Sequence, residues 1–228
     1  MMVWLLMSVI PERERAHVKE ILDKGMMGDV TLVNFTQEFE CDYCRETRQL
    51  LQELSQISGN RIRVEVYDFV RDADAATKFG VDKIPATVIT GGVVGHYGIR
   101  YFGVPAGYEF GSLLEDIIDV SRGSTRLSEL TKQRLRQVSK PVHIQVFVTP
   151  TCPYCPGAVR LAHQFAFENK LIRADMIESS EFPQLVGKYQ VMAVPKVVIN
   201  DAVSFGGALP EPHFLEQVLL ALEDRSHS

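Results

Sequence analysis

Apolar and polar residues follow one another along this chain in an order that occurs twice. In each half, a short apolar stretch typical of a buried strand, 30–36 or 142–148, precedes a segment with helical spacing. Residues 62–67 alternate cleanly, as in a sheet strand, and Gly91-Gly92 predicts a hairpin turn. The elements predicted for the first half are helices at 12–24, 41–58, 73–79 and 105–121 and strands at 30–36, 62–67, 86–90 and 96–102.

The second half repeats these elements in the same order. A βαβ unit followed by two strands and a helix predicts an α/β fold, with a central mixed sheet flanked by helices. Because 228 residues can form one domain or two, the repeat favours two units, 1–124 and 125–228. The elements predicted for the second unit are helices at 127–138, 152–168, 181–189 and 212–223 and strands at 142–148, 171–177, 196–200 and 202–205.

The cysteines add candidate chemistry to this repeat. All four fall into two Cys-x-x-Cys motifs, Cys41–Cys44 and Cys152–Cys155, whose first cysteines are 111 residues apart. Each motif lies between a predicted strand and a predicted helix, and each is followed by an apolar residue, a proline and another strand. These later pairs are Ile84-Pro85 and Val194-Pro195. A strand that delivers a cysteine pair to the start of a helix is typical of thiol–disulfide chemistry.

Three segments are long and specific: residues 97–110, Phe147-Val-Thr-Pro-Thr-Cys-Pro-Tyr-Cys-Pro156, and Met192-Ala-Val-Pro-Lys-Val-Val-Ile-Asn200. These segments carry a resemblance to the two-unit, glutaredoxin-like protein disulfide oxidoreductases of thermophilic archaea and bacteria. The resemblance covers nearly the whole chain. The resemblance implies two fused thioredoxin folds with one redox dithiol each. It also implies reductase, oxidase and often isomerase activity on protein disulfides, and it assigns Pro85 and Pro195 to cis-proline loops facing the dithiols.

The two cysteines of each motif are predicted to divide the chemistry between them. The first, Cys41 or Cys152, is expected at the helix N-cap, where free N–H groups and the helix dipole favour the attacking thiolate. The second, Cys44 or Cys155, lies one turn later and is expected to resolve the mixed disulfide. Acidic residues surround Cys41, whereas none lies in 145–159, so Cys152 is predicted to have the lower pKa.

Other residues near the motifs are candidates for substrate contact. Tyr43 and Tyr154 lie between the cysteines and are expected to form apolar contact surface for partner polypeptides, although each could be a simple surface aromatic. A cis proline would leave the backbone of Ile84 or Val194 free to pair with an extended substrate strand. Without a cis bond, the prolines would be ordinary strand-start residues. Gly206-Gly207 resembles the glutathione-contacting glycines of glutaredoxins or is simply a turn.

Spacing weighs against two other uses of the cysteines. Paired Cys-x-x-Cys motifs that share a zinc ion are usually separated by roughly 15–20 residues, whereas 107 residues lie between the motifs of this chain. An inert structural disulfide would close a loop of two residues, which constrains the unfolded chain very little. Redox dithiols without a metal or a cofactor are therefore the prediction.

Composition is that of an ordinary folded protein, with 46% hydrophobic and 23% charged residues. The net charge of −5 gives no sign of binding to nucleic acid or to an anionic membrane. Residues 1–10 are apolar but too short to span a bilayer, and they lack the features of a secretion signal. A cytoplasmic location is therefore expected, where cysteine pairs are seldom structural.

One departure from thioredoxins concerns the proton that the resolving cysteine must lose. Thioredoxins carry a buried acid beneath the dithiol, whereas the nearest positions of this chain hold Asn34 and Gln145-Val146. None of these accepts a proton as a carboxylate does, so another group or water is required.

The predicted function is that of a protein disulfide oxidoreductase. Its expected partners are proteins with disulfides or dithiols and a flavin-dependent, thioredoxin-reductase-like enzyme. A first rival is a dedicated electron carrier between a flavin disulfide reductase and a peroxiredoxin or ribonucleotide reductase. A second rival is a binding module without redox function, which the two intact motifs argue against.

Overall fold

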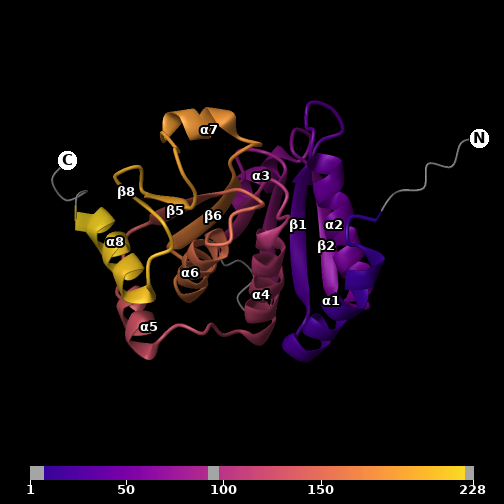
Figure 1. The fold of residues 1–228 in the computed structure, drawn as a ribbon, viewed down its shortest axis with the longest axis horizontal. Coiled ribbons are helices and arrows are strands. Elements are labelled where there is room, and N and C mark those ends of the chain that lie inside the picture. The colour runs from indigo at the N-terminus through magenta and orange to yellow at the C-terminus, as the bar shows by residue number, and fades with distance from the viewer. Residues whose placement is uncertain (1–7, 92–97, 224–228) are drawn as a thin grey trace, which may run out of the picture.

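The structure of the protein is a computed structural model that describes residues 8–91 and 98–223. Its elements occur in the same order in both halves of the chain (Figure 1), as predicted. The first half contains α1 (Glu12–Gly25), β1 (Val30–Thr36), α2 (Cys44–Ile57), β2 (Ile62–Asp68), α3 (Ala73–Phe79), β3 (Ala86–Gly91), β4 (Ile99–Phe102) and α4 (Tyr108–Arg122). The second contains α5 (Glu129–Arg136), β5 (Val142–Val148), α6 (Cys155–Glu168), β6 (Ile172–Glu178), α7 (Pro183–Lys188), β7 (Lys196–Ile199), β8 (Val203–Gly206) and α8 (Glu211–Glu223).

The helices that follow the two motifs begin later than predicted. The first helical residue is the second cysteine of each motif, Cys44 or Cys155, and the tyrosine before it is the N-cap residue. The expectation that the first cysteine caps the helix is therefore wrong. The reason is that the residues between the two cysteines form a turn before regular helix starts. Gly92 of the predicted hairpin and the start of the strand predicted at 96–102 lie outside the described residues.

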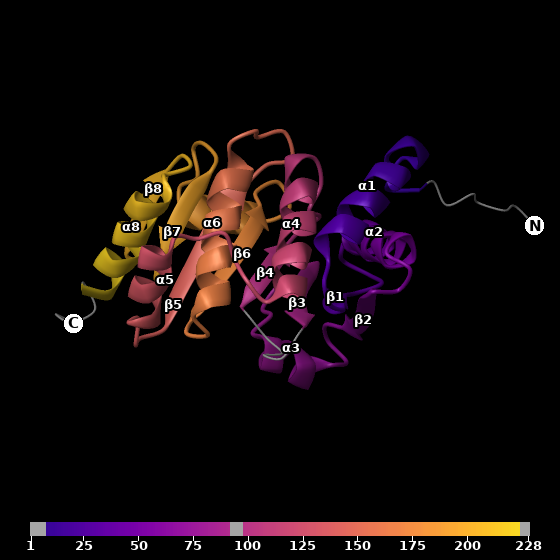
Figure 2. The ribbon, with the colours of Figure 1, turned by 90° about the horizontal axis from the view of Figure 1, so that it is seen from below.

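One eight-stranded sheet runs through the molecule, in the order β2-β1-β3-β4-β6-β5-β7-β8. The order of the first four strands is repeated in the second four, so each unit contributes one mixed sheet (Figure 2). The two sheets join at β4 and β6, which pair in parallel with Ile99 opposite Ala174. This confirms the α/β fold class with two tandem units, while the limits 1–124 and 125–228 stay a prediction.

Helices cover both faces of the sheet. α3 and α7 lie on one face (Figure 1), where Ala76 and Phe182 pack with Phe35 and Phe147 in a smaller hydrophobic cluster. The other six helices contribute to a larger cluster that is continuous through both units. The two units therefore share a core as well as a sheet.

Buried ion pairs also cross the junction between the units. Arg100 of β4 donates from Nε and from one terminal nitrogen to both carboxylate oxygens of Asp175 of β6, at 2.7 and 2.9 Å. Arg160 of α6 donates to Asp119 of α4 at 2.6 Å and contacts Asp116 as well. Such pairs are hydrogen-bonded at specific positions, so they hold β4 beside β6 and α4 beside α6.

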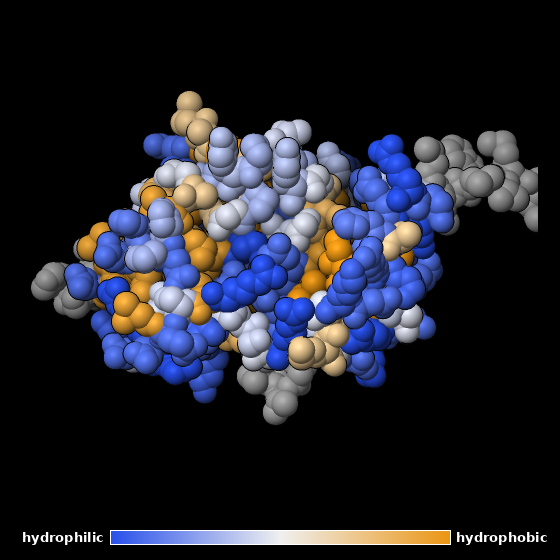
Figure 3. Space-filling model, turned by 60° about the horizontal axis from the view of Figure 1, so that its bottom comes forward, coloured by the Kyte–Doolittle hydropathy of each residue, from blue (hydrophilic) through white to orange (hydrophobic). Residues whose placement is uncertain are grey.

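The surface shown in Figure 3 is largely hydrophilic, with hydrophobic residues mainly in the furrows. Among the described residues, no helix combines the length and the apolar character needed to cross a bilayer. The exposed apolar side chains include Phe39, Tyr154 and Met192, which are 76%, 72% and 93% exposed. Each is within three residues of a motif cysteine or of a proline that follows a motif. Exposed apolar surface is thus present at both candidate sites.

Candidate functional site: two dithiols at one edge of the sheet

The first dithiol lies between β1 and α2. Cys41 and Cys44 form a disulfide with their Cα atoms 5.5 Å apart. Cys41 is half-buried, whereas Cys44 is 1% exposed because α2 packs it against the sheet. The thiolate of an attacking cysteine has to be accessible to a partner's sulfur. The difference in exposure is therefore the one that an attacking and a resolving cysteine require.

The second dithiol repeats this arrangement between β5 and α6. Cys152 and Cys155 form a disulfide, again with Cα atoms 5.5 Å apart. The N–H of Cys152 donates to the carbonyl of Thr149 at 3.1 Å, which closes the loop before the motif. Cys152 is 7% exposed and Cys155 is fully buried. The second dithiol is thus more covered than the first, although Tyr154 is more exposed than Tyr43 (72% against 42%).

Pro85 and Pro195 both follow cis peptide bonds, Ile84–Pro85 and Val194–Pro195, as the resemblance implies. The carbonyl of Pro85 accepts from the N–H of Gly103 at 2.9 Å, and that of Pro195 accepts from Gly207 at 2.8 Å. Both prolines are buried, and the residue before each is half-buried. Their part in substrate binding stays a prediction. Gly207 belongs to the turn before α8, and a contact with glutathione also stays a prediction.

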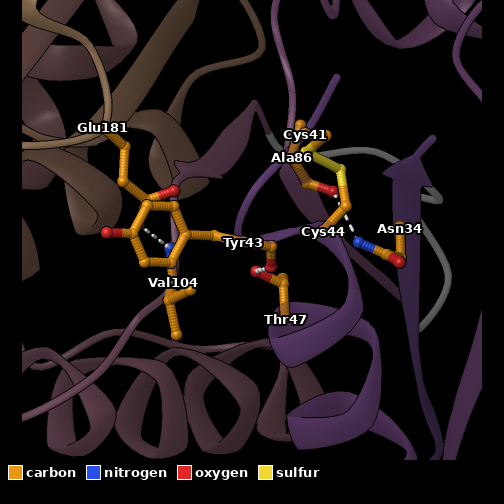
Figure 4. Close-up of a disulfide and its surroundings, with 8 residues drawn as sticks. All are labelled: Asn34, Cys41, Tyr43, Cys44, Thr47, Ala86, Val104 and Glu181. Atoms are coloured by element: carbon orange, nitrogen blue, oxygen red, sulfur yellow. Dashed lines mark hydrogen bonds between the residues drawn. A yellow bond between two sulfur atoms is a disulfide. The ribbon is translucent and has the colours of Figure 1, made fainter. Parts of the chain in front are cut away.

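Asn34 occupies the position beneath the first dithiol. Its side chain is fully buried, and its Nδ2 donates to the carbonyl of Ala86 at 3.0 Å, as Figure 4 shows. Asn34 therefore ties β1 to the residue that follows Pro85. In the second unit, the Nε2 of Gln145 donates to the hydroxyl of Tyr189 at 3.1 Å. Neither amide supplies a carboxylate to its dithiol.

Glu109 is a buried carboxyl group that sequence reasoning did not single out. It lies in the first turn of α4, is 1% exposed, and has the hydroxyl of Ser112 as its neighbour on the same helix. Burial raises the pKa of Glu109. The N–H of Tyr108 donates to the carbonyl of Pro150 at 3.1 Å. Because Pro150 is two residues before Cys152, Glu109 lies at the end of α4 nearest the second motif.

Glu181, between β6 and α7, approaches the first dithiol from the other unit. Its Oε1 accepts from the N–H of Val104 at 2.7 Å, and Figure 4 shows both residues beside the ring of Tyr43, on the side away from the Cys41–Cys44 disulfide. Glu181 and Tyr43 line one pocket. Burial raises the pKa of Glu181 to about 7, and the charges of Glu178 and Glu46 add to the rise. No sequence pattern indicates this contact, because it depends on the pairing of β4 with β6.

The two dithiols open at the same edge of the sheet. β1 runs antiparallel to β3 and β3 to β4, while β4, β6 and β5 are parallel, so β1 and β5 point the same way. Three strands separate β1 from β5, which places their ends four strand spacings, roughly 19 Å, apart. At this separation the four cysteines cannot share one metal ion, but one polypeptide can reach both dithiols.

Comparisons with known proteins agree with this geometry. Residues 142–220 match the family model of the thioredoxin domain. A thioredoxin from Methanocaldococcus jannaschii is 37% identical over 78 residues, which are 34% of this chain and 92% of that thioredoxin. The fold and the two disulfides therefore define a protein of the thioredoxin class with two Cys-x-x-Cys motifs.

A solved structure narrows this class to a family. The protein disulfide oxidoreductase from Aeropyrum pernix superposes with a TM-score of 0.85 at 33% identity, covering 91% of each chain. The chain belongs to this family of protein disulfide oxidoreductases. An alkyl hydroperoxide reductase component from Staphylococcus epidermidis is 26% identical over 181 residues, or 79% of this chain. The chain spans about a third of the length of such curated relatives.

Proposed function

We propose that this protein catalyses thiol–disulfide exchange on protein substrates through both of its dithiols. The observation that carries the proposal is the repeated arrangement of a strand, a disulfide between Cys-x-x-Cys residues, a buried second cysteine and a later cis proline. Family membership supports it. The test is the catalysed reduction of insulin by dithiothreitol. Wild type is expected to accelerate it, and the Cys41→Ser/Cys152→Ser protein is expected not to. Equal activity of the two proteins would overturn the proposal.

Reduction of a substrate disulfide would proceed in two exchanges. The thiolate of Cys41 or Cys152 attacks one substrate sulfur, which forms a mixed disulfide and releases the other substrate sulfur as a thiolate that takes a proton. The thiol of Cys44 or Cys155 then loses its proton and attacks the mixed disulfide. This step forms the intramolecular disulfide and releases the second substrate thiol. The substrate gains two electrons and the dithiol loses two.

For the second dithiol, we propose that Glu109 accepts the proton of Cys155. It is a buried carboxyl group at the end of α4 nearest the second motif, and burial raises its pKa. A raised pKa makes a carboxylate a stronger base when it is ionised. Glu109 thus supplies the carboxylate that Gln145-Val146 does not.

The common edge of the two dithiols supports isomerisation as part of the function. A scrambled substrate must have one disulfide broken and another formed, and two sites on one edge can engage two parts of the same chain. Reactivation of scrambled ribonuclease is the test. Wild type is expected to exceed the summed rates of the two single-site proteins. A rate no higher than that sum would show that the sites work independently.

A second candidate function is that of a dedicated electron carrier. The match to the alkyl hydroperoxide reductase component over 79% of this chain favours it. In that case, a flavin-dependent, thioredoxin-reductase-like enzyme would reduce this protein, which would pass electrons to a peroxiredoxin or ribonucleotide reductase. Rapid reduction by such a flavoprotein without any reactivation of scrambled ribonuclease would favour the carrier. Efficient reactivation favours the oxidoreductase.

We also propose which residues contact the substrate, where the two units end and where the protein acts. Tyr43 and Tyr154 supply apolar contact surface, and the backbones of Ile84 and Val194 pair with an extended substrate segment. The units extend over 1–124 and 125–228. The reactions proposed suit the cytoplasm, where thiol systems keep most cysteines reduced.

A further inference from the structure

A carboxyl group of the second unit is joined to the cis-proline loop of the first site by two consecutive peptide groups. The N–H of Val104 donates to Oε1 of Glu181 at 2.7 Å. The N–H of the adjacent Gly103 donates to the carbonyl of Pro85 at 2.9 Å. A displacement of Glu181 would therefore be transmitted to Pro85 through a chain of two hydrogen bonds.

Gly103 makes this close approach possible. Its φ is +94°, and a Cβ atom there would lie 2.6 Å from the Cβ of Glu178 and 2.8 Å from Oε1 of Glu181. In the second unit, the N–H of Gly207 donates the corresponding hydrogen bond to the carbonyl of Pro195. Among the described residues, however, no carboxylate bonds to Ala208, which follows Gly207. The carboxylate contact thus distinguishes the first site from the second.

Glu181 also lies beside Tyr43, the tyrosine between the two cysteines of the first motif. It lines a pocket with Tyr43, and the other titratable groups in that pocket are Glu46 of α2 and Glu178 of β6. The remaining lining residues are Val104, Ala106, Pro150 and Ser180, so no cation of the described residues lines the pocket. The Oε2 of Glu181 is buried without a hydrogen-bond partner among the described residues. Among the described residues that line the pocket, no cation therefore balances the negative charge of an ionised Glu181.

We propose that Glu181 is a positioning residue for the first dithiol: it holds the cis-proline loop through Val104, and its ionisation sets the stability of the Cys41 thiolate. The inference rests on the proposed thiol–disulfide function and adds a residue contributed by the other unit. The pKa of Glu181, raised to about 7 by burial and by the charges of Glu178 and Glu46, places its titration near neutral pH. A negative carboxylate disfavours a nearby thiolate, and the thiolate disfavours the carboxylate equally.

An external dithiol gives two electrons and two protons to the Cys41–Cys44 disulfide and becomes a disulfide itself. The S–S bond breaks, and one proton ends on Cys44. The second proton passes to solvent or to Glu181 where that carboxyl is ionised, and Cys41 is left as a thiolate.

The test uses the full-length chain with Cys44, Cys152 and Cys155 replaced by serine, so that Cys41 is the sole thiol. Its pKa is measured by thiolate absorbance. Glu181→Gln keeps an acceptor for Val104 and removes the charge, and it is expected to lower the pKa of Cys41 by about half a unit. Glu216→Gln removes the same charge from the exposed surface of α8 and is expected to leave that pKa unchanged.

Glu181→Ala removes the hydrogen bond as well as the charge and is expected to give at least the same shift. A shift with Glu181→Ala but not with Glu181→Gln would show a purely structural hydrogen bond and overturn the inference. An unchanged Cys41 pKa in both variants would also overturn it, while leaving the proposed function intact if dithiothreitol reduces wild-type Cys41–Cys44. Failure of dithiothreitol to reduce that disulfide would overturn both.

Discussion

The two dithiol sites share one backbone plan and differ in what surrounds it. The first lies close to the junction, where Glu181 of the other unit reaches the loop after β4. The second has a more exposed tyrosine, Tyr154, and Met192, three residues before Pro195, is 93% exposed. A duplicated fold can therefore present two similar cysteine pairs to different electrostatic and contact surroundings. The sites are expected to differ in chemistry even though they are alike in geometry.

The charge around Cys41 and Cys152, the two cysteines proposed to attack substrate, shows the difference most clearly. Near Cys41, the acidic residues Glu38, Glu40, Asp42 and Glu46 outnumber the basic residues Arg45 and Arg48. In the folded protein, Glu181 of the other unit adds a further acidic residue beside the first motif. Near Cys152, folding brings Glu178 opposite Val148 at the end of β5, and it brings Glu109, whose pKa is raised by burial, to the end of α4 nearest the second motif. The Glu178 carboxylate already accepts from the N–H of Glu181 and the hydroxyl of Ser180, so its charge is partly compensated.

Serine variants of the second motif should have the largest effect. Cys152→Ser removes the attacking sulfur and is expected to abolish insulin reduction at the second site, measured with Cys41 also replaced by serine. Cys155→Ser leaves the attack and removes resolution, so it should trap a mixed disulfide detectable by mass spectrometry. Trapping by Cys152→Ser instead would invert the assigned roles. The same pair of variants at Cys41 and Cys44 tests whether the first site divides the roles in the same way.

Asp175→Asn tests whether the two units are held together as one cooperative structure. Burial alone would raise the pKa of Asp175, but the charges of Arg100 and His143 outweigh it and hold the pKa well below its usual range. Removing the charge leaves Arg100 buried and uncompensated, which should cost about 3–5 kcal/mol of unfolding free energy. Urea unfolding measures the loss.

Because the pKa of Asp175 is depressed in the folded protein, the wild-type advantage should be complete above the unfolded pKa, about 3.9, and shrink as pH falls below it. Asp29→Asn is the matched control, since its ion pair with Arg63 is 3.1 Å long but exposed. It should change stability by less than about 1 kcal/mol. An equal effect of the two substitutions would contradict the part assigned to the junction.

Glu109→Gln should slow resolution of the mixed disulfide at the second site and leave the first site unchanged. Without the carboxylate, the proton of Cys155 must pass to water, and resolution at neutral pH is expected to slow by about tenfold to a hundredfold. The lifetime of the mixed disulfide in a Cys41→Ser background measures this. Cys41–Cys44, measured in a Cys152→Ser background, serves as the control and should resolve at the wild-type rate. Equal slowing of both sites would point to a general structural defect instead.

The smallest expected effect is the difference between the two thiolates. Cys152 should have a pKa lower than that of Cys41 by about one unit or less, because each solvated charge contributes only a few tenths. Absorbance titrations of full-length proteins that retain only Cys41 or only Cys152 make the comparison. A Cys41 pKa equal to or below that of Cys152 would show that the local charges do not govern the difference.

Much of the fold follows from local sequence pattern. The ranges predicted for β1 and β5, 30–36 and 142–148, agree with the structure residue for residue, because apolar residues predominate in each and the ends of each stretch are clear. The start of α2 was predicted three residues early, since sequence does not show where a turn becomes a helix. The approach of Glu181 to Val104 was not predicted at all, because it depends on two strands from different units that pair across the junction.

The reduction potential of each dithiol, measured in full-length proteins that retain only one motif, tests the central claim most directly. If both sites are functional but unequal, both disulfides should be reduced reversibly. The Cys152–Cys155 potential should be the higher of the two by about 10–30 mV, because a more stable thiolate stabilises the reduced form. A disulfide that stays oxidised at every accessible potential, or a higher potential for Cys41–Cys44, would contradict it.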